Sequence, residues 1–246
     1  MSGHSKWHNI QAKKGKADAA RGKIFTKLGR ELAVAAKQGA DPSTNSKLAD
    51  VIAKAKAANM PNDNIKRSIA KAAGEMGSVN YETLMYEGYG VGGSAVMVTT
   101  LTDNKNRTAG DVRHIFDKYG GNLGTNGSVS FMFEYAGVIV VERTPDLDED
   151  IMMEYALDSG ADDCIVSDDV YEFRTSPSAF SSVRNYLEGK GVEFLEADIE
   201  YIPNDKVDLN EEQIVTFEKM LAALEDNDDV QDIYHNVNLP DDEEEE

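Results

Sequence analysis

The strongest constraint on the fold of this chain is the order of its elements between residues 138 and 202. Short runs rich in Val, Ile, Tyr and Phe are typical of strands, and two longer runs between them have the apolar spacing of helices. The six runs, taken in chain order, are VIVVER, DEDIMMEYALDSG, DDCIVS, VYEFRTS, SAFSSVRNYLEGKG and VEFLEADIEYI. A strand-helix-strand-strand-helix-strand order of this kind predicts a ferredoxin-like βαββαβ domain.

The segments on either side of this module are expected to form one further domain. The predicted elements are strands at 81–90, 94–103 and 127–137 with a helix at 106–120 before the module, and a helix at 210–226 with a strand at 229–239 after it. Strands and helices of this kind must pack against each other to bury their apolar faces. We therefore expect a discontinuous α+β domain, 78–134 with 205–239, interrupted by the ferredoxin-like domain at 135–204.

The segment 1–77 predicts a small helical domain preceded by a basic arm. From Lys23 onward, apolar residues recur at helical spacing, and Gly39 ends the run. Asn45 is a cap for a second helix, and Pro61 suits the first turn of a third helix over 62–73. The fold class is therefore α+β and multidomain, with a three-helix domain at the N-terminus. The last segment, 240–246, forms an acidic tail that we expect to be disordered.

Charge is distributed very unevenly along the chain. The formal net charge is -20, yet the segment 1–77 contains 15 Lys and Arg against 6 Asp and Glu. Salt screens charges over about 10 Å, so the acidic remainder does not prevent local attraction of an anion. A basic segment on an acidic body predicts that this segment meets a polyanion such as DNA or RNA.

The candidate nucleic-acid-binding residues lie in the arm and along one face of the first helix. Four cations of that helix fall in one narrow stripe at about 100° per residue, and phosphates attract the arm whether or not it is folded. Trp7 adds a ring that can stack on an unpaired base. The candidates are Lys6, Trp7, His8, Lys13, Lys14, Lys16, Arg21, Lys23, Lys27, Arg30 and Lys37. The alternatives are that the stripe is a solvated face and that Trp7 only anchors the arm.

The second and third helices also permit a helix-turn-helix interpretation. The third helix would then be the recognition helix that faces a major groove. It would present Asn62, Asn64, Lys66, Arg67 and Lys71. Any two short helices joined by a tight turn give this pattern, so an ordinary corner of a helical bundle is the favoured interpretation.

Other functional classes are poorly supported by the residues. Apolar runs fall short of the roughly 20 residues of a membrane helix, and we expect a cytoplasmic protein with no membrane partner. Cys164 is expected to be a buried thiol, and His4 with His8 lacks the further ligands of a metal site. We predict no catalytic residues, no metal and no cofactor. An enzyme acting around His114 and the loop GGNLGTNG is the rival hypothesis, and the sequence assigns no oligomeric state.

Long strings of this chain closely resemble the YebC/PmpR family. They include GHSKWHNI, RGKIFTKLGRELAVAAKQG, NMPNDNIKRSIAKAAG, YEGYGVGG and LTDNKNRTAGDVRHIFDKYGGNLGTNGSVSF. The family has a mitochondrial relative, the translational activator of cytochrome oxidase subunit I. The resemblance implies a three-domain fold and a nucleic-acid-binding regulator of gene expression, with DNA-binding transcriptional control as the first expectation. It also implies an alternative, a ribosome-associated translation factor that relieves stalling at consecutive prolines.

Overall fold

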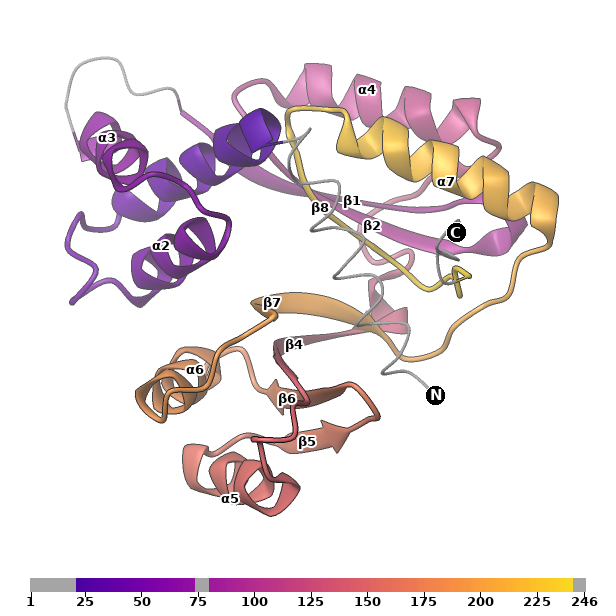
Figure 1. The fold of residues 1–246 in the computed structure, drawn as a ribbon. Coiled ribbons are helices and arrows are strands. Elements are labelled where there is room, and N and C mark those ends of the chain that lie inside the picture. Colours follow the sequence, from indigo (N-terminus) through magenta and orange to yellow (C-terminus); the bar gives the residue numbers. More distant parts are fainter. Residues whose placement is uncertain (1–20, 74–79, 241–246) are drawn as a thin grey trace. The chain divides into compact units, whose positions relative to one another are not determined.

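The structure is a computed structural model that describes residues 21–73 and 80–240 (Figure 1). The described chain forms two compact units. One consists of Arg21–Glu134 together with Pro203–Leu239, and the other of Tyr135–Ile202.

Three helices form the first part of the larger unit, as the sequence predicted. They cover residues 21–36, Ser46–Ala57 (α2) and Asn62–Ala73 (α3). Asn45 caps α2 by accepting from the backbone N–H of Leu48 at 3.0 Å, and its amide donates to the carbonyl of Ala35 at 2.8 Å. One side chain thus both starts a helix and ties it to the preceding one. The buried apolar residues are Leu28, Leu32, Ala35, Ala36, Leu48, Ala55, Met60 and Ile65.

A four-stranded sheet with two helices makes up the rest of this unit. Its elements are β1 (Glu82–Tyr89), β2 (Ala95–Thr102), α4 (Lys105–Lys118), β3 (Asn122–Leu123), α7 (Glu211–Glu225) and β8 (Val230–His235), with a short 3-10 turn, η1, at Val91–Gly93. The strand order is β3-β1-β2-β8, and β1 with β2, β1 with β3 and β2 with β8 all pair antiparallel. The helices α4 and α7 lie side by side over one face of the sheet (Figure 1). Phe116 and Phe217 are fully buried there against Val96 and Val98.

The smaller unit has the predicted ferredoxin-like order. Its elements are β4 (Phe133–Glu142), α5 (Glu149–Ser159), β5 (Asp163–Val166), β6 (Val170–Thr175), α6 (Phe180–Gly189) and β7 (Glu196–Pro203). The sheet order is β5-β6-β4-β7, so β6 lies between the two strands of the first βαβ unit. Phe173, Phe180 and Leu187 lie in its core. The predicted α+β multidomain fold class is confirmed.

One predicted strand was wrong. The sequence pattern placed a strand at 127–137, whereas the structure has a 3-10 turn, η2, at Ser130–Met132 and one continuous strand, β4, from Phe133 to Glu142. The reason is Glu87, whose carboxylate accepts backbone N–H groups of Gly127, Val129 and Ser130 at 2.8, 3.0 and 2.9 Å. Those donors are therefore not available to a strand ladder. The two-residue strand β3, which the sequence pattern did not predict, pairs with β1.

Candidate nucleic-acid interface

The helix over 21–36 positions the basic stripe, defined here as Lys23, Lys27, Arg30 and Lys37. Leu28 and Leu32 are buried on its apolar side, in the core of the three-helix part. Because a helix turns about 100° per residue, the cations at 23, 27 and 30 lie together on another side. Lys37 follows in the turn after the helix, where its Nζ donates to Asn80 Oδ1 at 2.9 Å.

The acidic segment Glu225–Asp229, from the last residue of α7 to the residue before β8, faces this stripe within the same unit. Lys23 forms an ion pair with Asp226, although both side chains keep much of their exposure. Lys27 is half-buried and donates to the carbonyl of Glu225 at 3.4 Å. Burial lowers the pKa of Lys27, while the charges of Asp232, Glu225 and Asp228 act in the opposite direction. The stripe is thus neither fully solvated nor fully open, because each of its members has an intramolecular partner.

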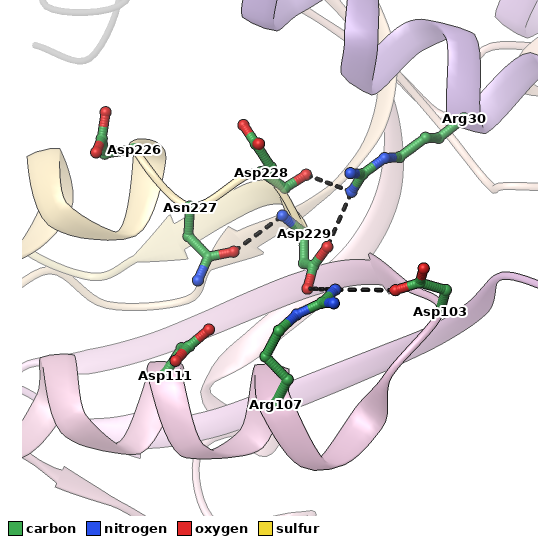
Figure 2. Close-up of a pocket in the computed structure, with 8 residues that line it drawn as sticks. All are labelled: Arg30, Asp103, Arg107, Asp111, Asp226, Asn227, Asp228 and Asp229. Atoms are coloured by element: carbon green, nitrogen blue, oxygen red, sulfur yellow. Dashed lines mark hydrogen bonds and ion pairs between the residues drawn. The ribbon is translucent and has the colours of Figure 1, made fainter.

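Asp229 is the centre of this contact (Figure 2). Its buried carboxylate accepts from Arg30 at 3.0 Å, from Arg107 at 2.7 Å and from the Thr108 hydroxyl at 2.8 Å. Burial alone would raise the pKa of Asp229, but the hydrogen bonds from Arg107 and Thr108 and the charge of Arg107 outweigh burial, and the pKa is lowered. The carboxylate is therefore held ionised between two guanidinium groups.

Arg30 is fixed by more than this ion pair. Its Nη1 also donates to the carbonyl of Asp228 at 2.6 Å, and its guanidinium lies over the ring of Tyr81, 5.4 Å from the centroid. A guanidinium with a carboxylate, a carbonyl and an aromatic face around it is well satisfied. A phosphate approaching Nη1 of Arg30 would have to compete with Asp229 and the Asp228 carbonyl.

An open hollow of about 400 Å³ lies beside this cluster (Figure 2). Its lining consists of Arg30, Asp103, Arg107, Asp111, Asp226, Asn227, Asp228 and Asp229. Carboxylates outnumber cations in it, so the hollow does not attract a phosphate chain. Arg107 and Asp229 were not among the site residues predicted from the sequence. The acidic string EDNDD at 225–229, opposite in charge to the stripe, is the signal that points to Asp229.

The exposed face of α3 differs from the stripe. Lys66, Arg67 and Lys71, named here the α3 face, are all exposed. Among the residues that the structure describes, none gives these three a hydrogen bond, an ion pair or a ring contact. The buried side of the same helix holds Ile65 in the core, with Ile69 packed against it.

The remaining candidates of the arm lie outside the described residues: Lys6, Trp7, His8, Lys13, Lys14 and Lys16. Arg21 is exposed at the beginning of the described helix. The stripe and the arm therefore stay predictions as nucleic-acid contacts.

The sites that could support the rival enzyme hypothesis, around His114, the loop GGNLGTNG and Cys164, give little support for catalysis. The loop GGNLGTNG and the residues after it direct N–H groups to Glu87, whose pKa they lower against the effect of burial. His114 lies in a shallow hollow of about 260 Å³ whose lining includes Asp111 and Asp226 but no residue of that loop. Burial raises the pKa of Cys164 to about 11, which keeps the thiol protonated, as expected of a buried cysteine. Within 21–73 and 80–240, no cluster of His, Cys, Asp and Glu is arranged to hold a metal ion.

Comparison with known proteins matches both parts of the chain to one family. Residues 5–75 match the family model described as the TACO1/YebC protein N-terminal domain, and residues 81–237 match the TACO1/YebC second and third domain. The chain belongs to the TACO1/YebC family. The resemblance predicted from its motifs is thereby confirmed.

Relatives of similar length and a solved structure agree with this assignment. The chain is 59% identical to a probable transcriptional regulatory protein of Hathewaya histolytica and 60% identical to one of Clostridium botulinum, in each case over 98% of both chains. A crystal structure of a conserved hypothetical protein from Aquifex aeolicus matches with a TM-score of 0.81 and 42% identity, over 94% of this chain and 96% of that chain. Across the described residues, every helix is too short or too polar to traverse a membrane.

Proposed function

We propose that this TACO1/YebC protein is a nucleic-acid-binding regulator of gene expression that acts as a DNA-binding transcriptional regulator in the cytoplasm. The observation that carries the proposal is its near-full-length similarity to proteins named probable transcriptional regulatory protein. Their names favour a regulatory role over a catalytic one. The positive charge of the segment 1–77, on a chain of net charge -20, supports contact with DNA through this part.

In this proposal, residues 1–77 form the domain that contacts the nucleic acid. The α+β domain, 78–134 with 205–239, and the ferredoxin-like domain, 135–204, would then position that contact or bind protein, with an acidic tail at 240–246. Family matches at 5–75 and 81–237 support a boundary near residue 77. The compact unit Tyr135–Ile202 supports the inserted domain.

Binding of the purified full-length chain to duplex DNA, single-stranded RNA and ribosomes tests the proposal. We expect duplex DNA to bind, and replacing Lys6, Lys13, Lys14 and Lys16 together by Gln to lower the slope of log affinity against log salt by about 4, if each lysine neutralises one phosphate. The matched control replaces Lys105, Lys118, Lys206 and Lys219, exposed lysines of the acidic part, and should change the slope little.

A second candidate is translational control on the ribosome, which the Trp7 of the basic arm favours because an indole can stack on unpaired bases. Binding to ribosomes and RNA without binding to duplex DNA would favour translational control over transcriptional control. Absence of binding to all three probes at modest ionic strength would overturn the proposed function in both forms.

A further inference from the structure

The helical part carries two cationic surfaces, and only their surroundings distinguish them. The basic stripe meets the acidic segment Glu225–Asp229, whereas the α3 face meets no acidic partner among the described residues. At about 100° per residue, Lys66, Arg67 and Lys71 span roughly 140° of the exposed side of α3. Ala70, also exposed, lies between them and leaves room for close approach.

We infer that the α3 face is a docking surface for the phosphate backbone of duplex DNA. This inference rests on the proposed function and specifies which residues contact the DNA. Three cations without ion pairs, all within 66–71 of one helix, are a phosphate-contacting pattern. Their charge is offset by one acidic residue of the same helix, Asp63, which forms no ion pair within the described residues. The face therefore keeps most of its positive potential for a ligand.

The local geometry favours a duplex over a single strand. Single-stranded nucleic acid is generally bound by aromatic side chains on which the bases stack. Residues 46–73, which include all of α2 and α3, contain no Phe, Tyr or Trp. A helix with its side chains is about 10–12 Å wide, which suits a major groove about 12 Å across.

The connection between α2 and α3 is the tight turn that such docking needs. Residues 58–61 join the helices, and Asn59 has a left-handed φ of 58° that ends α2. Met60, buried in this turn, and Ile65 hold α3 against the rest of the three-helix core. The exposed face of α3 is thus presented by a helix that follows α2 after a tight turn and packs on the three-helix core.

The test is binding of a mixed-sequence DNA duplex of about 20 bp, measured by fluorescence anisotropy between about 50 and 200 mM salt. In the full-length chain, the triple variant Lys66→Gln, Arg67→Gln and Lys71→Gln should lower the salt slope by about 3 and the affinity at about 100 mM salt by at least about tenfold. The matched control, Lys105→Gln, Arg113→Gln and Lys219→Gln, removes the same charges from exposed positions of α4 and α7. It should weaken binding less than about threefold.

Further variants separate a lost contact from a lost fold. Since the three exposed side chains make no hydrogen bond, ion pair or ring contact among the described residues, we expect the melting temperature of the triple variant to stay within about 2 °C of the wild type. The pair Lys66→Arg and Lys71→Arg keeps the charges and should keep the affinity.

The outcomes also separate this inference from the proposed function. If the wild type binds duplex DNA and the triple α3 variant binds it equally well, the inference about the α3 face is wrong and the proposed function stands. Equal losses of affinity in the triple variant and its control would have the same meaning. A loss restricted to single-stranded RNA would overturn the assignment to duplex DNA. A wild-type chain that bound no duplex would overturn both.

Discussion

The basic stripe and the α3 face are two cationic surfaces of the same three-helix part, and their environments are opposite. In the stripe, Lys23 and Arg30 pair with Asp226 and Asp229, which come from the far end of the chain. On the α3 face, the cations are exposed and unpaired within the described residues. In both the basic stripe and the α3 face, the cations recur on one side of a helix. Spacing in the sequence therefore does not reveal whether a charge is available to a ligand.

The difference has an energetic reason. Like charges on one side of a helix repel weakly, and a nearby carboxylate removes that repulsion. In the stripe the carboxylates come from a distant segment that packs on the helix, and the ion pairs become part of the domain contact. On α3 the repulsion stays unrelieved, which a domain tolerates at low cost on an exposed surface.

The largest expected effect is on the centre of the stripe contact. Asp229→Ala removes the buried acceptor of Arg30, Arg107 and Thr108 and leaves Arg30 partly buried without its carboxylate. The free energy of unfolding, measured by urea denaturation, should fall by about 3 kcal/mol. Asp228→Ala is the control, because only the backbone carbonyl of Asp228 accepts from Arg30. Equal losses in the two variants would show that the ion pair does not carry the contact.

A smaller effect should appear on acidification. The pKa of Asp229 is lowered in the folded protein, so its stabilising contribution is complete above the ordinary Asp pKa of about 3.9 and is lost as the pH falls through the lowered value. The stability difference between the wild type and Asp229→Asn should therefore shrink from about pH 5 to about pH 3. The corresponding difference for Lys66→Gln should not change, since no carboxylate pairs with it among the described residues. A pH-independent difference for Asp229→Asn would contradict this account.

The smallest effect concerns the exposed end of the stripe. Lys23 and Asp226 form an ion pair between side chains that are 47% and 78% exposed, so Lys23→Gln should lower the free energy of unfolding only slightly. High salt should remove that cost, because exposed pairs are screened. Lys66→Gln should be neutral at either salt concentration. A loss for Lys23→Gln as large as that for Asp229→Ala would place this pair among the structural contacts of the three-helix part.

Much of the fold could be predicted because local signals determine it. Asn45 caps α2, and Gly39 with a φ of 143° follows the first helix, as their residue types indicated. The ferredoxin-like order also follows from periodicity. The strand expected at 127–137 failed because its N–H groups bind Glu87, a partner 40 positions away that no local pattern reveals.

By itself the sequence determined the element order, the family and the concentration of positive charge in the segment 1–77, because periodicity, capping residues and charge are properties of neighbouring positions. Only the tertiary structure decided which of those charges remain open to a ligand. The packing of Glu225–Asp229 on the stripe brings opposite charges together from the two ends of the chain, and Coulomb attraction depends on that distance in space rather than on separation along the chain.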